Sequence, residues 1–580
     1  MAIKRIVSLA LAAFIALALA AFPAAAESAQ PDLSAARYGM EPFENPVTIR
    51  IPVFDRARDD VPDVSSNYYT KWVNEAFGKP LNVTVEFVPI TRTDTMGAYN
   101  LLLAGGDWPT VFMEYDWPKV TQWDADGALA KIDVEEFAAV APTWTELAGG
   151  LEQFAMFTMN GEQKVLPALR PYWDTNYTYA TFYRKDWYEQ AGIELFTTYE
   201  EYVDAMALFM ELGFTNGKPI LPKAPFSENF QVYGDSEWPR SEEEWAMYSD
   251  VSVAPLPARG AYYSLKKQNS EYHLGLYNTE FELDVEGTGS ASQAITDFIN
   301  GEAYSYANYL GADMPDLTAF YENNPDAKLG VIYNNTVYDP WVDAMGGHTV
   351  PQGRATNPAG MFVGFSSKAS ADELKAAYMY MEWVAQPDVL FFYQNGVEGE
   401  TYTMSADGLP EIVGGYTGDY WMGYGNNKDY WCIAIEVRTV GTIEQTIAAI
   451  SPKGLPQDFT QELIDNYYIL KAYANDGLLY VDPFFSTNID SVSEYAGDLK
   501  AKFQEYATAL VKCDPEEFDA LYEKYVAEYK AAGYQEIMDE RLAAYQNGLS
   551  TLLPDVAAGR APYAPSDITE VVTTKYTIGQ

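Results

Sequence analysis

The chain of 580 residues has few of the residues on which metal centres depend. It holds two cysteines, Cys432 and Cys513, and two histidines, His273 and His348. Two cysteines cannot build a disulfide framework, although this pair could form one bridge in an exported protein. The histidines lack the spacing of zinc ligands, so we expect no metal site and no bound cofactor.

Positive charge is also scarce. The chain has 37 Lys and Arg against 83 Asp and Glu, which gives a formal net charge of −46. A phosphate backbone or an anionic lipid surface must be neutralised by clustered basic residues, and an acidic surface repels both. Nucleic acid is therefore not expected as a partner.

Common catalytic motifs are missing as well. The sequence contains no G-x-S-x-G, no phosphate-binding P-loop and no H-E-x-x-H. We therefore predict a protein that is not an enzyme. A glycosidase stays open as an alternative, because its two carboxylates could be drawn from so many acidic residues.

One long hydrophobic run is present, at the N-terminus. Lys4 and Arg5 precede an apolar stretch over residues 6–22, and Ala24, Ala25 and Ala26 follow. This is the layout of a cleavable secretory signal over residues 1–26, with an uncleaved anchor as the alternative. No cysteine follows the run for lipid attachment, so we expect an exported, unlipidated protein.

Strand and helix patterns alternate near the start of the mature chain. Strands are predicted over 47–53, 83–88 and 110–113, with helices over 67–77 and 95–103. This order predicts a parallel sheet with helices on its faces, and such sheets bind ligands beyond the carboxyl ends of their strands. Capping boxes at Thr198 and Ser370 predict two further helix starts.

Several stretches, in order, resemble one protein family. They are LLLAGGDWPTVFMEYD (101–116), GEQKVLP (161–167), YRKDWYEQAGI (183–193), FINGEA (298–303), MFVGFSSKASADELKAAYMYMEWVAQPD (361–388) and GVEGETYTMSADGLP (396–410). The chain resembles the extracellular solute-binding proteins of ABC sugar importers (family 1), in particular the large lipoprotein-type subgroup that binds oligosaccharides.

The resemblance implies a two-lobed α/β periplasmic-binding-protein fold, type II-like, in which each lobe is a mostly parallel sheet flanked by helices. It places the first lobe over 45–166 and 330–395 and the second over 167–329 and 396–565, with extra C-terminal helices and a tail over 566–580. Two departures stand out. Many relatives carry an Asp/Asn-rich calcium loop where residues 212–222 read LGFTNGKPILP, so we expect the calcium site to be lost. The lipid-bearing cysteine is absent too.

A sugar site combines aromatic rings for C–H faces with polar partners for hydroxyl groups. The resemblance points to loops that follow strands of the lobes. The first candidates are Asp107, Trp108, Tyr115, Asp116, Trp117, Arg170, Tyr172, Trp173 and Asp174. The further candidates are Tyr306, Asn308, Tyr309, Asp339, Trp341, Asp343, Trp421 and Tyr424.

Each candidate has a structural alternative. Trp117 and Trp173 could be ligand platforms or packing residues, and Asp116 and Asp174 could bind ligand or stand in solvated turns. Arg170 could clamp the carboxylate of an acidic sugar or neutralise Asp174.

The sequence therefore predicts the substrate-binding component of an ABC importer. It is expected to be a monomer outside the cytoplasm that closes around a carbohydrate and delivers it to permease subunits. An oligopeptide binder, a glycan-active enzyme and an adhesin are the alternatives.

Overall fold

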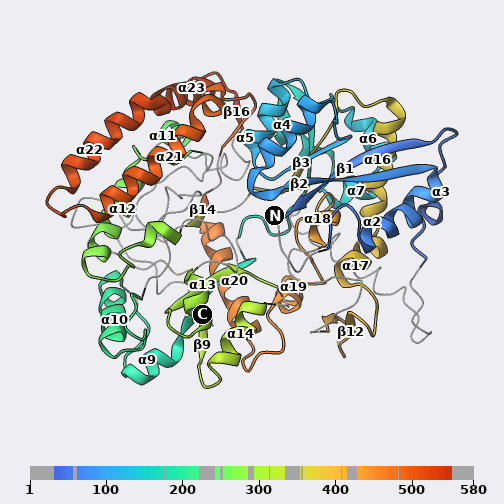
Figure 1. Ribbon diagram of the computed structural model, residues 1–580. Helices are drawn as coiled ribbons and strands as arrows, with labels where there is room; N and C mark the ends of the chain where they lie inside the picture. Colours follow the sequence, from blue (N-terminus) through green and yellow to red (C-terminus); the bar gives the residue numbers. More distant parts are fainter. Residues whose placement is uncertain are drawn as a thin grey trace. The chain divides into compact units, whose positions relative to one another are not determined.

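The computed structural model describes residues 32–56, 62–175, 177–196, 198–220, 242–248, 253–284, 293–311, 314–332, 353–354, 357–406, 408–413, 427–476, 479–480 and 483–551. These residues form two compact units (Figure 1). Unit 1 takes its described residues from 32–173, 357–450 and 486–488. Unit 2 takes its described residues from 174–354, 451–485 and 489–551.

The boundaries of these units differ from those that the sequence predicted. Residues 396–450, assigned to the second lobe, belong to unit 1, and β9 (Leu329–Ile332) belongs to unit 2. The physical reason is packing: the indole N–H of Trp144 donates to the Ile433 carbonyl at 2.9 Å, and the Glu436 N–H donates to the Leu169 carbonyl at 2.8 Å. These contacts hold the segment against unit 1.

Unit 1 begins with the predicted alternation of strands and helices. β1 (Val47–Asp55) pairs in parallel with β2 (Val83–Thr91), in a register that runs from Val47 opposite Val83 to Asp55 opposite Thr91. Between the strands lie α2 (Tyr68–Val73), η2 (Asn74–Gly78) and α3 (Lys79–Leu81). The Asn67 side chain caps α2. The predicted order of strands and helices over residues 47–113 is confirmed, but β3 (Val111–Glu114) belongs to another sheet and does not extend the parallel pair.

The second sheet of unit 1 departs from the parallel expectation. Its order is β3 (Val111–Glu114), β11 (Ala359–Phe365), β6 (Val165–Leu169), and β11 is antiparallel to both neighbours. A parallel neighbour needs a crossover within the same sheet, usually a helix. β11 instead re-enters unit 1 after a long excursion through unit 2, so nothing forces it to run parallel.

Helices enclose the core of unit 1. α16 (Ala371–Val384) starts at the predicted capping box, where Ser370 and Glu373 bond to each other's backbone N–H groups. Its residues from Ala376 to Val384 are all buried. Trp123, Trp144 and Trp383 fill this core.

The other elements of unit 1 are η1 (Ala35–Tyr38), η3 (Arg92–Asp94), α4 (Thr95–Gly105), α5 (Trp117–Ala125), α6 (Val134–Val140), α7 (Pro142–Leu147), α8 (Leu151–Phe154), η4 (Ala155–Phe157), β4 (Thr158–Met159), β5 (Glu162–Gln163), α17 (Pro387–Asn395), β12 (Tyr402–Met404), β13 (Pro410–Ile412), α18 (Lys428–Trp431) and α19 (Ile443–Ile450).

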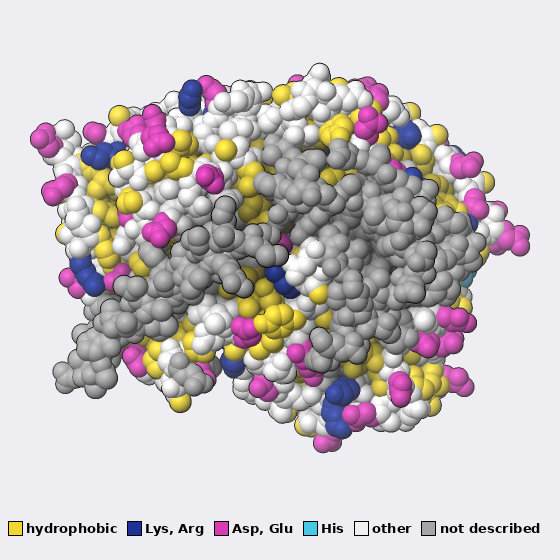
Figure 2. Space-filling model, turned by 180° about the vertical axis from the view of Figure 1, so that it is seen from behind, with side chains coloured by type: hydrophobic (Ala, Val, Ile, Leu, Met, Phe, Trp, Pro, Cys, Tyr) yellow, Lys and Arg dark blue, Asp and Glu magenta, His cyan; other side chains and the backbone are white. Residues whose placement is uncertain are grey.

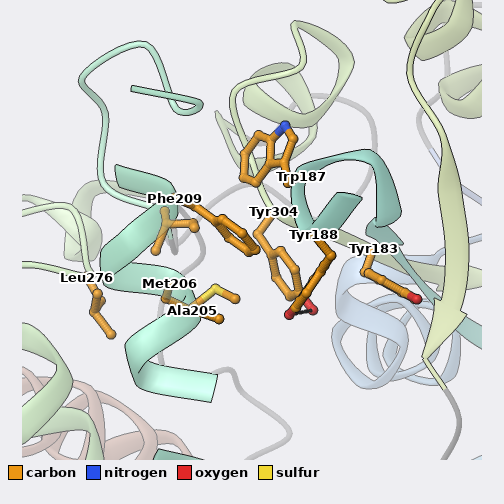
Figure 3. Close-up of a cluster of buried hydrophobic side chains, with 9 residues drawn as sticks. Tyr183, Trp187, Tyr188, Ala205, Met206, Phe209, Leu276 and Tyr304 are labelled. Atoms are coloured by element: carbon orange, nitrogen blue, oxygen red, sulfur yellow. Dashed lines mark hydrogen bonds between the residues drawn. The ribbon is translucent and has the colours of Figure 1, made fainter. Parts of the chain in front are cut away.

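Unit 2 is built around a three-stranded sheet of order β8 (Ser305–Tyr309), β7 (Tyr179–Arg184), β9. Both pairings of β7 are antiparallel, so this sheet too lacks the expected parallel bias. Beside it, α9 (Lys185–Ala191) and α10 (Tyr199–Glu211) bury an aromatic cluster shown in Figure 3. Within that cluster the hydroxyl groups of Tyr188 and Tyr304 lie 3.1 Å apart and share a hydrogen bond.

The predicted C-terminal helices are present in unit 2. They are α21 (Asp490–Lys512), α22 (Phe518–Tyr529) and α23 (Gln535–Gln546), and they pack with α11 (Glu242–Tyr248) and α12 (Arg259–His273). Gly533 has φ 120° between α22 and α23, where a side chain would collide with the Tyr495 ring. The other elements are η5 (Phe281–Asp284), α13 (Gln293–Ile299), α14 (Pro315–Asn323), β10 (Gly353–Arg354), α20 (Thr460–Asp476), β14 (Leu479–Tyr480), β15 (Phe484–Phe485), η6 (Lys530–Tyr534) and β16 (Ser550–Thr551).

Surface charge, free thiols and helix hydrophobicity can be given for the described residues of both units. Acidic side chains are spread over the described surface, with basic ones between them (Figure 2). Cys432 and Cys513 are both free thiols, so the possible bridge is not formed. Among the residues described, no helix has the length and apolar character needed to cross a membrane.

Candidate ligand-binding site

Three strand ends of unit 1 converge on one place. Phe54 is the penultimate residue of β1, Arg92 directly follows β2, and Tyr115 directly follows β3. β1 and β2 are parallel, and the Thr110 N–H donates to the Arg50 carbonyl at 2.9 Å, which brings the start of β3 beside β1. The carboxyl ends of all three strands therefore meet, at the edge where α/β sheets bind ligands.

The side chains at this edge form an aromatic stack with basic groups on it. The rings of Phe54 and Tyr115 stack with centroids 6.1 Å apart. The Arg92 guanidinium carbon lies 5.0 Å from the Phe54 centroid and 5.5 Å from the Tyr115 centroid. Lys428 Nζ lies 5.9 Å from the Tyr115 centroid. These four side chains are called the strand-end cluster below.

A neighbouring ion pair borders the cluster. Arg56 donates to both carboxylate oxygens of Asp429 at 3.0 Å. The Asp429 side chain is 3% exposed, so its charge is buried and balanced by one arginine in bidentate geometry. Asp429 thus fixes the chain just after β1 to the start of α18.

The ionisable groups beneath the cluster stay neutral. Burial raises the pKa of the Tyr115 hydroxyl well above its usual value of 10.0, and it raises the pKa of the Cys432 thiol to about 12. A thiol becomes a nucleophile only as a thiolate. Both groups are therefore uncharged at neutral pH, and Cys432 offers no thiolate nucleophile.

Unit 2 has an aromatic pair at a comparable position. Tyr179 at the start of β7 is the register partner of Tyr309 at the carboxyl end of β8, and their rings meet edge to face at 5.1 Å. Tyr179 is 50% exposed. An exposed aromatic pair offers a face for the C–H groups of a sugar.

Of the predicted residues near β3, only Tyr115 joins the strand-end cluster. Asp107 and Trp108 precede β3, so they lie at its other end. There the Trp108 indole N–H donates to the Leu103 carbonyl at 3.0 Å, and Lys368 Nζ lies 3.5 Å from the centroid of the Trp108 ring. These two candidates are not brought together with Tyr115.

Asp116 and Trp117 follow Tyr115 directly but are already engaged. Asp116 pairs with Lys119 at 2.8 Å. Trp117 is 7% exposed and packs on Phe157 and Phe362, with ring centroids 5.9 and 4.9 Å away. The structure thus favours packing over a platform for Trp117.

Arg170 is neutralised, but by a residue other than the one expected. Its guanidinium forms an ion pair with Glu436, and a second bond to Glu436 Oε1 measures 3.3 Å. Asp174, the expected partner, pairs with Lys471 instead. Because the Arg170 guanidinium already binds the carboxylate of Glu436, it is not placed to clamp the carboxylate of an acidic sugar.

The chain leaves unit 1 at two further candidates. Tyr172 has φ 53°, which is uncommon for a residue other than glycine, and burial raises the pKa of its hydroxyl. Trp173 is partly buried. Neither residue belongs to the strand-end cluster in unit 1.

The candidates on β8 divide into one packing residue and two that border the Tyr179 pair. Tyr306 is buried, stacks on Phe298 at 4.8 Å and donates to Asp316 at 2.7 Å. Asn308 bonds to the Tyr306 hydroxyl, and Tyr309 is partly exposed. The remaining candidates lie outside the described residues: Asp339, Trp341, Asp343, Trp421 and Tyr424.

Sequence reasoning missed most of the strand-end cluster, although a signal was present. Phe54 directly follows the strand predicted over 47–53, and Arg92 comes a few residues after the strand predicted over 83–88. Applying the carboxyl-end rule to all three predicted strands would have selected both. Lys428 could not be found this way, because it comes from a helix distant in sequence.

The sequence matches a known protein family. Residues 72–390 match the family described as bacterial extracellular solute-binding protein. The match spans more than half of the chain. The chain belongs to this family. No curated protein matches the sequence.

Solved solute-binding proteins share the fold. The alginate-binding protein AlgQ2, solved without calcium ion, is 15% identical with a TM-score of 0.56, and the match covers 87% of this chain and 99% of that one. An extracellular solute-binding protein from Bifidobacterium longum subsp. infantis is 15% identical over the same shares, with a TM-score of 0.57. An EF-hand mutant of FusA from S. pneumoniae, in complex with fructo-nystose, is 13% identical over 86% and 99%, with a TM-score of 0.55. The two-domain periplasmic-binding fold is thereby confirmed.

This solute-binding protein does not present a calcium loop at residues 212–220. Calcium takes six to eight oxygen ligands, several of them carboxylates. Here the Thr215 hydroxyl donates to the Lys218 carbonyl at 2.6 Å, and Lys218 Nζ reaches Asp297 and Glu302. Asn216 also donates to Glu302 at 3.0 Å. An ammonium group occupies the carboxylates nearest this loop, so the donor set does not fit a divalent cation.

Proposed function

We propose that this solute-binding protein is the substrate-binding component of an ABC importer and captures an oligosaccharide between two lobes that close on a hinge. Family membership supports the binding role. The ligands of two proteins with related structures, alginate and fructo-nystose, support a carbohydrate. Closure would be driven by the contacts that a ligand makes with both lobes only in the closed state.

The strand-end cluster carries this proposal. A sugar ring presents an apolar C–H face and a rim of hydroxyl groups, so it needs an aromatic surface beside hydrogen-bond donors. The partly exposed Tyr115 supplies the surface, the buried Phe54 ring stacks against it, and Arg92 supplies N–H donors beside it. In unit 2, Tyr179 and Tyr309 would supply a second surface.

Binding without catalysis is part of the proposal. A glycosidase needs one protonated carboxylic acid and one free carboxylate flanking the bond to be broken. The buried Asp429 and the partly buried Glu436 are both ion-paired with arginines. Burial raises the pKa of Glu436, but the stronger combined effect of Arg170 and Lys428 holds it below its usual value, so this group is unsuited to act as an acid.

The proposal includes export of the protein and its binding partners. Residues 1–26 would be removed on export, and the mature chain would act as an unlipidated monomer in the periplasm or outside the cell. Its partners would be the sugar and the permease subunits of the importer. An oligopeptide binder is the alternative ligand class.

A binding screen tests the proposal. The mature chain is purified after export, and its unfolding midpoint is measured with neutral oligosaccharides, acidic oligosaccharides and oligopeptides. A ligand that binds only the folded state raises the midpoint by mass action. We expect oligosaccharides to raise it and oligopeptides to leave it unchanged. A rise with oligopeptides alone would overturn the assignment of a sugar.

A further inference from the structure

Arg92 differs from the other arginines of the chain. Six arginines with described side chains form ion pairs with carboxylates: Arg37, Arg50, Arg56, Arg170, Arg184 and Arg259. Arg438 and Arg541 donate to oxygen atoms of the chain. Among these described arginines, Arg92 alone has neither an ion pair nor a hydrogen bond; its contacts are the rings of Phe54 and Tyr115.

This exception matters in so acidic a protein. With 83 acidic residues against 37 basic ones, a basic side chain readily finds a carboxylate. Arg92 is partly buried, yet its guanidinium edge is unused. A guanidinium stacked on aromatic rings keeps its N–H groups in a planar fork, which matches a carboxylate or sulfate in bidentate geometry.

The surroundings favour the same kind of ligand. Lys428 places a second positive charge near the Tyr115 ring, with its Nζ atom 5.9 Å from the ring centroid. The nearby carboxylate of Asp429 is buried and balanced by Arg56, so its negative charge is compensated before a ligand arrives. Long-range repulsion from the acidic surface is screened beyond about 8 Å at physiological salt, so short-range contacts at Arg92 decide the affinity.

We propose that the ligand is an acidic oligosaccharide and that Arg92 receives its anionic group. This inference rests on the proposed function, because it names the class of sugar that the strand-end cluster would take. The sugar ring would lie beside Tyr115, whose ring is supported by the buried Phe54, while the Arg92 fork binds the anionic substituent. The carboxylate of a uronic acid and a sulfate ester share this chemistry.

Titration calorimetry on the mature chain tests the inference. The probes are tetrasaccharides of galacturonate, mannuronate, guluronate and glucuronate, each paired with its carboxyl-reduced counterpart, which keeps the backbone and loses the charge. A sulfated and a neutral tetrasaccharide with the same backbone complete the set. We expect at least one acidic probe to bind at least about tenfold tighter than its neutral counterpart.

Variants of Arg92 test whether its side chain contacts the anionic group of the ligand. Arg92→Gln should weaken the preferred acidic probe by about 10- to 100-fold and leave the neutral probes within about twofold. Arg92→Lys, which keeps the charge without the fork, should fall between Arg92→Gln and the native chain. Arg37→Gln, which removes the same charge from an exposed position in unit 1, should match the native chain. The unfolding midpoint of Arg92→Gln should fall only slightly, since the variant loses contacts with the Phe54 and Tyr115 rings but no hydrogen bond.

The outcomes separate the two proposals. Binding of neutral oligosaccharides as tight as of acidic ones, or an acidic probe that binds Arg92→Gln at full affinity, would overturn the role of Arg92 and leave the proposed function standing. Binding of oligopeptides without any oligosaccharide would overturn both. A preference for the sulfated over the carboxylated probe would keep Arg92 and identify a sulfate ester as the anion.

Discussion

Lys218 Nζ lies 2.6 Å from the Oδ1 oxygen of Asp297, a carboxylate that is 8% exposed. Lys218 also pairs with Glu302 at 2.5 Å, so one ammonium group ties the loop after α10 to α13 and to the turn before β8. These bonds raise the pKa of Lys218 and lower that of Glu302. The loop is therefore fixed by a cation that belongs to the chain.

We predict that Lys218→Met lowers the free energy of unfolding by about 1 to 2 kcal/mol, because it leaves Asp297 with fewer partners. Partial exposure of Lys218 keeps the loss at the lower end of what a buried pair would cost. Urea denaturation measures the change. The control is Lys328→Gln, whose partner Glu189 is exposed, and it should cost almost nothing.

Calcium should not stabilise the loop over residues 212–220. We expect the unfolding midpoint of the native chain to be the same with added Ca²⁺ and with a chelator. A rise with Ca²⁺ that disappears in a variant of Asp297 would show that the loop binds the ion after all.

Arg170 should stabilise the fold by balancing Glu436. Arg170→Met would leave a carboxylate that is only 14% exposed without its main partner and should cost about 1 to 3 kcal/mol, whereas removing both charges with Arg170→Met and Glu436→Leu should cost less. A double-mutant cycle in urea measures the coupling. Equal and additive losses would contradict a direct role for the pair.

The same pair predicts a dependence on acid. The pKa of Glu436 is lowered in the fold, so its stabilising contribution is complete above the usual value of 4.5 and is lost as the pH falls through the lowered pKa. The unfolding free energy of the native chain should fall below pH 4.5, and the paired variant Arg170→Met with Glu436→Leu should fall less steeply.

Alkaline pH should unfold the protein through its buried hydroxyl and thiol groups. Burial raises the pKa of Cys432, of Tyr378 and of Tyr402 to about 12. A group whose pKa is raised in the fold costs stability once the unfolded chain ionises, so stability should decline between about pH 9 and 12. Alkylation of Cys432, located by peptide mapping and followed together with circular dichroism, should rise only as the fold is lost. Rapid alkylation of Cys432 in the folded protein would be the contrary result.

Tyr179 should bind ligand without stabilising the fold. Tyr179→Ala removes an exposed ring and should weaken oligosaccharide binding by about tenfold while the unfolding midpoint stays the same. Leu274→Ala, at another exposed apolar side chain of unit 2, is the matched control. A lowered midpoint with unchanged affinity would assign Tyr179 to packing.

The sequence predicts local structure well where one segment decides it. The strands and helices over 47–113 and the capping boxes at Thr198 and Ser370 depend on nearby residues, and all are present. The partners of Arg170 and the assignment of residues 396–450 depend on contacts between distant segments, which no local pattern encodes. Trp117 shows the same limit. A tryptophan at this position is compatible with a ligand-binding platform, and only its packing on Phe362 shows that the ring is buried.

The measurement that bears most directly on the account is small-angle scattering of the mature chain over time, with and without the oligosaccharide that binds best. A captor that closes on a hinge predicts a smaller radius of gyration with ligand, constant over time, and a ligand that is recovered intact. An unchanged radius at saturation, or a ligand recovered as cleaved products, would contradict it.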